Sequence, residues 1–238
     1  MPFGGPHPGM RILFVMDNPG TAVRPFNSVL RLLETRGHQI HLAFQRLTTS
    51  ESYNELRRLA DECPGITFGK VPSSAGSSWA PLTRSLRFGA DYLRYFDPRF
   101  TEATKLRATA KRRAPATVRR LARLAGLLGP TAILSLRGVI EALERSMPPP
   151  DRVERFVAEH DPDLVLVTPL VLLGSVQAGW LRAAKRLGIR SVYPVLSWDN
   201  LTTKGLIRDI PDLMRSRCTR CFWTSFERRR KGRSTSTI

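Results

Sequence analysis

One short polar segment, residues 197–204 with the sequence SWDNLTTK, holds the side chains best suited to chemistry. The carboxylate of Asp199 can accept the proton of an attacking hydroxyl group that lies within hydrogen-bond reach. The indole of Trp198 can stack on a sugar ring, and the ammonium of Lys204 can pair with a phosphate or a carboxylate. We therefore predict that Asp199 is a catalytic carboxylate. The substrate-binding residues predicted in this segment are Ser197, Trp198, Asn200 and Lys204.

The same segment has a simpler interpretation as a turn. Asp and Asn side chains stabilise turns by bonding to their own backbone, so Asp199 and Asn200 need no further role. The position of the segment favours function, because it directly follows the apolar run 191–196. Ligand chemistry in α/β proteins gathers beyond the carboxyl ends of parallel strands. Both interpretations stay open on the sequence alone.

A second candidate segment, Asp17-Asn18-Pro19-Gly20, joins the apolar run RILFVM to a stretch with helical periodicity. The free backbone amides at the start of such a helix can bind an anion. The segment is equally a tight turn, and no GxGxxG fingerprint supports nucleotide binding. Arg24 either reaches into the same site or lies on the surface. The substrate-binding residues predicted here are Asn18, Gly20 and Arg24.

The elements that position these segments follow from an alternation of apolar runs with amphipathic stretches. The apolar runs predict strands at 11–16, 39–44, 66–71, 163–168 and 191–196. The stretches between them predict helices, among them 51–63, 152–160 and 174–187. Strands that are apolar throughout are typical of parallel sheets covered on both faces. The predicted fold class is therefore α/β, with a Rossmann-like parallel sheet flanked by helices.

Residues 81–147 lack a strand pattern and predict a basic helical insertion. Nine Lys and Arg but no acidic residue lie between 103 and 140. If Pro115 opens a helix, one side of it carries Val118, Leu121, Ala122, Ala125 and Leu128. The other side carries Arg119, Arg120 and Arg123 together with Leu124 and Leu127. Such a helix is either a solvated face or a surface that lies on an anionic membrane. Nucleic acid is disfavoured, since base-stacking aromatic residues are missing from 103–140.

The remaining composition narrows the class of protein. The net charge of +18 concentrates in this insertion and in the last 28 residues. Three cysteines, of which Cys218 and Cys221 form a lone CxxC, suggest neither a disulfide framework nor a zinc site. We expect no metal and no cofactor. His38, His41 and His160 stand alone in the sequence, and we expect each to be structural or exposed. No apolar run reaches the ~20 residues that span a bilayer, and the N-terminus lacks a signal peptide, so we expect a cytoplasmic protein, peripheral at most to the inner membrane face.

Two stretches resemble the N-terminal, acceptor-side domain of bacterial GT-B glycosyltransferases. They are MRILFVMDNPG…RPFNSVLRLLETRGHQIHLAF and PDLVLVTPLVLLGS…AAKRLGIRSVYPVLSWDNLTTKG, and SWDNLTTKG is the more specific part. The resemblance implies two Rossmann-like domains that face each other across a cleft. The first receives the acceptor, which can be lipid-linked, and the second holds the nucleotide-sugar donor. The alternative function is a non-catalytic basic protein that binds a membrane surface or nucleic acid.

The resemblance ends near residue 211, where an Arg, Cys and Ser-rich sequence begins. We expect residues 1–9 to be a disordered extension and 10–210 to be the Rossmann-like domain, with 81–147 inserted. Residues 211–238 would be a basic tail, disordered or produced by a frameshift or truncation. The donor-binding domain would then be missing, and the chain alone would transfer no sugar. We also expect the sheet to lack a strand after Pro211, which would expose an edge and lower solubility.

Overall fold

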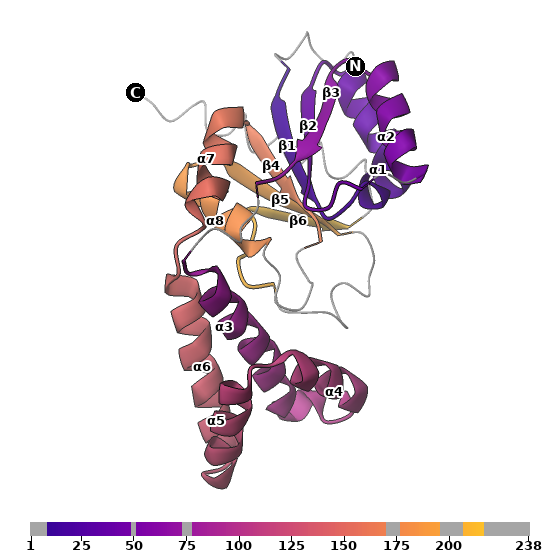
Figure 1. The fold of residues 1–238 in the computed structure, drawn as a ribbon. Helices are drawn as coiled ribbons and strands as arrows, with labels where there is room; N and C mark the ends of the chain where they lie inside the picture. The colour runs from indigo at the N-terminus through magenta and orange to yellow at the C-terminus, as the bar shows by residue number, and fades with distance from the viewer. Residues whose placement is uncertain (1–8, 49–50, 73–77, 170–176, 196–206, 217–238) are drawn as a thin grey trace, which may run out of the picture.

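A six-stranded parallel sheet forms the centre of the fold (Figure 1). The computed structural model describes residues 9–48, 51–72, 78–169, 177–195 and 207–216. The strands are β1 (Arg11–Met16), β2 (Gln39–Phe44), β3 (Ile66–Lys70), β4 (Leu164–Val167), β5 (Arg190–Val195) and β6 (Leu213–Ser216). Their order is β3-β2-β1-β4-β5-β6, and every neighbouring pair is parallel. The predicted Rossmann-like α/β fold is confirmed.

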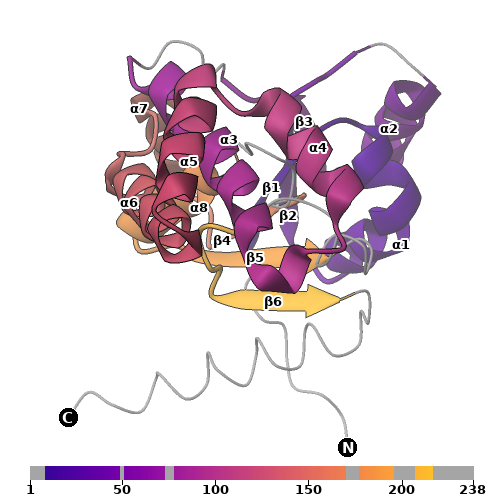
Figure 2. The same ribbon diagram turned by 90° about the horizontal axis from the view of Figure 1, so that it is seen from below.

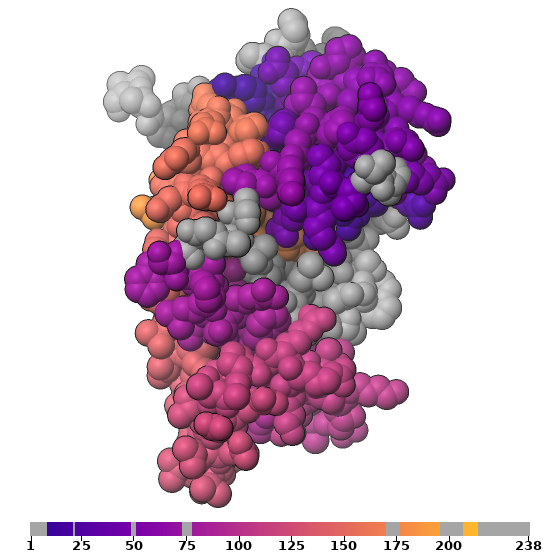
Figure 3. Space-filling view, in the orientation of Figure 1, coloured from indigo at the N-terminus to yellow at the C-terminus, as the bar shows by residue number. Residues whose placement is uncertain are grey.

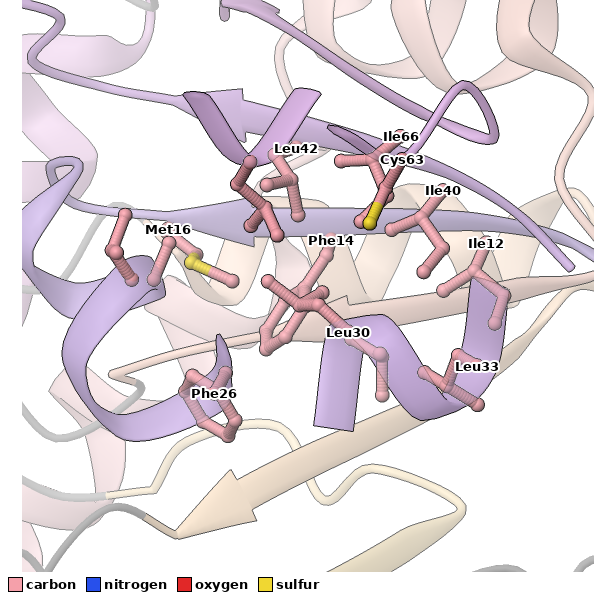
Figure 4. Packing of buried hydrophobic residues seen from close by; sticks show 14 of the residues in the cluster. Ile12, Phe14, Met16, Phe26, Leu30, Leu33, Ile40, Leu42, Cys63 and Ile66 are labelled. Carbon is pink, nitrogen blue, oxygen red and sulfur yellow. The ribbon is translucent and has the colours of Figure 1, made fainter. Parts of the chain in front are cut away.

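Helices cover both faces of the sheet, which explains why its strands are apolar throughout. Alternate residues of β1 point to opposite faces. Ile12, Phe14 and Met16 pack against α1 (Gly20–Thr35) and α2 (Glu51–Glu62), as Figure 4 shows for α1. Leu13 and Val15 pack on the other face against α7 (Asp151–His160) and α8 (Ala178–Arg186). Each face thus has its own apolar core.

A helical insertion between β3 and α7 forms a separate lobe below the sheet (Figures 1 and 3). It consists of α3 (Ala80–Leu93), the short 3-10 helices η2 (Arg94–Phe96) and η3 (Pro98–Phe100), α4 (Thr104–Arg113), α5 (Ala116–Leu127) and α6 (Pro130–Ser146). The insertion has a core of its own, in which Val118 and Ala122 of α5 are buried. Gly89 lets α5 approach α3 closely, because a Cβ there would lie 3.0 Å from Val118. The predicted helical insertion is confirmed.

The prediction for the inner side of α5 is wrong at two positions. Leu121 and Leu128 were expected to pack inward beside Val118, but both are exposed. Leu124 and Leu127 are exposed, as predicted. Only Val118 and Ala122 of α5 are buried, so the side that packs against α3 and α6 is narrower than predicted and leaves Leu121 and Leu128 in water.

The sheet continues past Pro211, contrary to our expectation. β6 pairs with β5 in parallel from Val192–Leu213 to Val195–Ser216. Asp212 fixes the start of this pairing, because its Oδ2 accepts hydrogen bonds from the Ser191 amide at 2.8 Å and from the Ser191 hydroxyl at 3.0 Å. The four residues of β6 are too few to show the alternating or continuous apolar pattern that predicts a strand. The exposed edge expected at β5 is therefore absent from the sheet.

Of the ends predicted to be disordered, 1–9 and 211–238, residues 1–8 and 217–238 lie outside the described residues, whereas β6 lies within the predicted tail. The first part of the helix expected at 174–187, which the structure describes from Ala178, also lies outside the described residues. Within the described part of the chain, no helix is long and apolar enough to cross a membrane.

Candidate ligand-binding site

A cavity of about 710 Å³ opens at the carboxyl edge of the sheet. Its walls come from segments that directly follow β1, β2 and β3, and from α3, the start of α7, and α8. The polar and aromatic residues among its lining are Asp17, Gln45, Arg46, Trp79, Thr83, Arg84, Ser85, Arg87, Trp180 and Arg182. The order β3-β2-β1-β4-β5-β6 reverses its direction between β1 and β4, and ligands of open α/β sheets bind in the crevice beside such a reversal. The cavity therefore lies at the edge where this fold class binds ligands.

Asp17 organises the sheet side of the cavity. Its Oδ2 accepts hydrogen bonds from the Arg46 guanidinium and, at 3.1 Å, from Asn18 Nδ2. The Arg46 amide donates to the Asp17 carbonyl at 2.8 Å. The hydrogen bond to Asp17 raises the pKa of Arg46 above its ordinary value. Gln45, the residue before Arg46, lines the same wall. Its Nε2 is buried and has no hydrogen-bond partner among the described residues.

An exposed tryptophan stands on the opposite side. Trp79 precedes α3 and is 51% exposed, although it lines the cavity. Arg84, one turn further along α3, places its guanidinium 5.5 Å from the centre of the Phe88 ring. An exposed indole beside polar groups is a surface on which a sugar ring can stack.

A buried ionic network forms the floor between the helical lobe and the sheet. The Glu144 carboxylate of α6 accepts from Arg87 Nε of α3 at 2.7 Å and from Arg182 Nη2 of α8 at 2.8 Å. Arg182 Nε also donates to Asp209 at 2.9 Å. In parallel, Arg208 donates to Asp91 at 2.8 Å. The network thus joins α3, α6 and α8, which are distant in the sequence, and also segment 208–209.

The pKa values of the network follow from burial and from these pairs. Burial disfavours the charged form of Glu144, but Arg87 and Arg182 outweigh it, so the pKa of Glu144 is lowered. Burial also opposes the charge of Arg182, yet Asp209 and Glu144 raise its pKa. Burial dominates at Arg87 and lowers its pKa, although Glu144 partly offsets that effect. The two carboxylates, Glu144 and Asp209, face the two arginines, Arg87 and Arg182, across these ion pairs.

The lining therefore carries little uncompensated charge. Arg46 is paired with Asp17, and Arg87 and Arg182 are paired with Glu144. Arg84 adds one positive charge at the rim. Such a cavity suits a polar, hydroxyl-rich ligand that carries no charge or one negative group.

The structure places three of the predicted site residues. Asn18 lies in the turn between β1 and α1, beside Asp17, and Gly20 is the first residue of α1; neither is among the residues that line the cavity. The turn is packed, since a Cβ on Gly20 would lie 3.2 Å from Asn18 Oδ1 and 3.4 Å from Ser52 Oγ. Arg24 is exposed on the first turn of α1 and is not among the cavity lining. Their roles in binding stay predictions.

The other predicted residues lie outside the described residues: Ser197, Trp198, Asp199, Asn200 and Lys204. The described chain stops at Val195, the last residue of β5, and resumes at Ile207. Because β5 is parallel to β4 and thus to β1, Val195 lies at the same edge of the sheet as Asp17. The catalytic role of Asp199 stays a prediction.

Sequence reasoning missed Gln45, Arg46, Trp79 and Arg84. Gln45 and Arg46 directly follow a predicted strand, so the rule that selected residues 197–204 could have found them. Trp79 and Arg84 lie before and within a helix of the insertion, and no local pattern connects them with the sheet edge. In the folded chain both line the cavity together with residues that follow β1, β2 and β3.

No protein-family model, curated protein or solved structure matches the chain. The chemistry of the cavity therefore has to be inferred from its own residues. Among the described residues, no group of three or more His, Cys, Asp and Glu could hold a metal ion.

Two histidines that stand far apart in the sequence meet near the opposite edge of the sheet. The rings of His41 and His160 lie 4.5 Å apart, on β2 and at the end of α7. His41 Nδ1 lies 2.9 Å from Thr67 Oγ1, and His160 Nδ1 lies 2.8 Å from the Phe156 carbonyl oxygen. Burial, and to a lesser extent His160, lower the pKa of His41 from 6.5 to about 4.

Acidification is expected to destabilise the fold through His41. The folded state favours neutral His41, so its contribution is complete above the ordinary pKa of 6.5 and is lost as the pH falls toward about 4. The whole shift in the pKa of His41 would correspond to a larger loss in the free energy of unfolding. Because His41 is partly exposed, we expect a loss of about 1–2 kcal/mol. Urea unfolding across this range measures it, and His41→Gln should flatten the curve there. Arg11, which lies beside the two histidines, forms an exposed ion pair with Asp161. An unchanged slope in His41→Gln would contradict the assignment.

Proposed function

We propose that this chain is the acceptor-binding domain of a GT-B-like glycosyltransferase. The cavity at the carboxyl edge binds a hydroxyl-rich acceptor, and Asp199 accepts the proton of the acceptor hydroxyl. The hydroxyl oxygen forms a bond to the anomeric carbon of the sugar, and the bond from that carbon to the nucleotide phosphate breaks. The nucleotide-sugar donor is held by a second domain, as in the family that the sequence resembles.

One observation carries the proposal: a cavity of acceptor size opens at the carboxyl edge of a sheet with the order β3-β2-β1-β4-β5-β6. β5 ends at this edge, and segment 197–204, with its carboxylate, indole and amide side chains, follows β5 in the sequence. The nearly balanced charge of the lining and the exposed indole of Trp79 also favour a sugar-like ligand over a polyanion.

Replacing Trp79 by alanine is expected to weaken saccharide binding. Glucose, N-acetylglucosamine and cellobiose serve as acceptor-type probes, and UDP-glucose serves as a donor-type probe. Loss of one stacking face should raise the Kd of the bound saccharide about five- to tenfold. Saturation-transfer NMR on the full chain identifies the binding probe, and titration gives the Kd.

Leu82→Ala is the matched control, because Leu82 is also an exposed apolar residue of α3 but does not line the cavity. It should leave the Kd unchanged. Equal Kd values for the two variants would remove Trp79 from the site. Binding of UDP-glucose without any binding of the saccharides would contradict an acceptor-binding role.

A further inference from the structure

Four leucines at the end of α5 are exposed to a degree that the fold does not require. Leu121, Leu124, Leu127 and Leu128 are between 47% and 84% exposed. They lie within eight consecutive positions, the last of them directly after the helix. A group of large apolar side chains left open to water marks a surface that binds something. We call these four residues the leucine patch.

The leucine patch lies at the end of the molecule farthest from the sheet. In Figure 1, the turn between α5 and α6 is the lowest point of the helical lobe. Figure 2 views the molecule from this side, and there α4 and α5 lie in front of the sheet. A broad partner can therefore approach the patch and both helices without meeting the sheet.

The two helices on this side are strongly basic. α4 carries Lys105, Arg107, Lys111, Arg112 and Arg113, and α5 carries Arg119, Arg120 and Arg123. No acidic residue occurs between 103 and 140. Within the described part of the chain, none of these eight side chains forms an ion pair with a carboxylate. The exposed charges of α4 and α5 are thus all positive.

We propose that this end of the lobe docks on an anionic lipid bilayer. The leucine patch enters the boundary between headgroups and acyl chains, and the arginines and lysines of α4 and α5 bind lipid phosphates. The inference goes beyond the proposed function, and it does not depend on what the cavity binds.

Two other partners fit the surface less well. A second copy of this chain would bring two sets of unpaired cations together, with no acid between 103 and 140 to compensate them. A nucleic acid would satisfy the cations but would leave the leucines in water, and neither α4 nor α5 has an aromatic residue to stack on a base. Only an anionic bilayer offers negative charge and an apolar layer at the same surface.

Vesicle co-flotation of the full chain tests the proposal. The vesicles consist of phosphatidylcholine alone or of phosphatidylcholine mixed with phosphatidylglycerol. We expect binding to the mixed vesicles, little binding to phosphatidylcholine alone, and weaker binding as salt rises. Leu127→Asn with Leu128→Asn should lower the partition coefficient about tenfold, because two exposed leucines no longer insert. Substituting glutamine for Arg119, Arg120 and Arg123 should lower it about a hundredfold.

Matched controls lie on the far side of the molecule, on α1 and α2. Leu32→Asn replaces an exposed leucine, and Arg57→Gln with Arg58→Gln replaces two exposed arginines. Both should bind like the unmodified chain. Because residues 228–231 are also basic, charge alone does not locate the surface, and the leucine variant decides.

Three results would overturn the proposal. The first is no binding to the mixed vesicles. The second is binding that the leucine substitutions leave unchanged, as purely electrostatic attraction would. The third is a leucine variant that turns an oligomer into a monomer in sedimentation velocity without affecting vesicle binding, which would assign the patch to a second copy. None of these results bears on the saccharide titration, so the two proposals fail separately.

Discussion

Replacing Glu144 with glutamine is expected to lower the free energy of unfolding by about 3–5 kcal/mol. The side chain of Glu144 is 2% exposed and neutralises two buried arginines, Arg87 and Arg182. Glutamine keeps the size and one acceptor oxygen but removes the charge. Two guanidinium groups would then stay buried with too little compensation, which costs more than the pair itself contributes. Urea denaturation followed by circular dichroism measures the loss.

The expected loss also has a pH signature. A carboxylate whose pKa is lowered on folding contributes stability above its ordinary pKa, and this contribution is lost as the pH falls through the lowered value. Glu144→Gln should therefore reduce the loss of stability that occurs as the pH falls below the ordinary carboxyl pKa of 4.5.

Glu141→Gln is the matched control for Glu144. It lies one turn earlier on α6 and pairs with Arg137 across an i,i+4 spacing, with both side chains partly exposed. Its expected cost is about 0.5 kcal/mol. Equal effects of the two substitutions would show that Glu144 is not the centre of a buried network. Arg87→Met combined with Glu144→Gln should recover part of the loss, because one unpaired charge is then removed.

Replacing Phe14 with alanine is expected to cost about 3–5 kcal/mol. Phe14 lies in the middle of β1, the strand between β2 and β4, and is 1% exposed. Its ring packs edge-on against Phe26 of α1, with 5.0 Å between the ring centres. Figure 4 shows both side chains in the core. The substitution would remove that contact and leave a cavity between sheet and helix, since close-packed cores collapse only in part. The loss is a large share of the ~5–15 kcal/mol that stabilises an ordinary domain.

Phe14→Leu keeps the measurement possible if the alanine variant does not fold, and should cost about 1–2 kcal/mol. Leu32→Ala on the exposed side of α1 is the control, with a change within about 0.5 kcal/mol. A loss below about 1 kcal/mol for Phe14→Ala would mean that the core relaxes around the missing ring.

The fold was predictable because its signals are local. The apolar runs 11–16 and 39–44 coincide with β1 and β2. The other three predicted runs differ from β3, β4 and β5 by one residue at one end or at both ends. β6 was missed because a strand of four residues at the edge of a sheet has no periodicity of its own and depends on its pairing with β5. The positions of Leu121 and Leu128 were missed for a related reason: helical periodicity tells which residues share a side, but the width of the contact depends on the neighbouring helix.

The candidate site was predictable only in outline. Ligands bind beyond the carboxyl ends of parallel strands, which predicts sites at Asn18 and at Asp199. The same position holds for Gln45 and Arg46, which follow β2. The opposite wall, with Trp79, comes from the insertion, whose course no local pattern specifies.

The sequence by itself determined most of the strands and helices and the side that each buries, because helical and strand periodicity are properties of neighbouring residues. The tertiary structure alone decided which polar groups meet. Glu144 pairs with Arg87 and Arg182, which lie 57 and 38 residues away, and His41 meets His160. Such pairings depend on distances between packed elements, and removing the groups from water makes each of them strong. The strand order that brings Asp17, Val195 and the helical insertion to one edge of the sheet was decided in the same way.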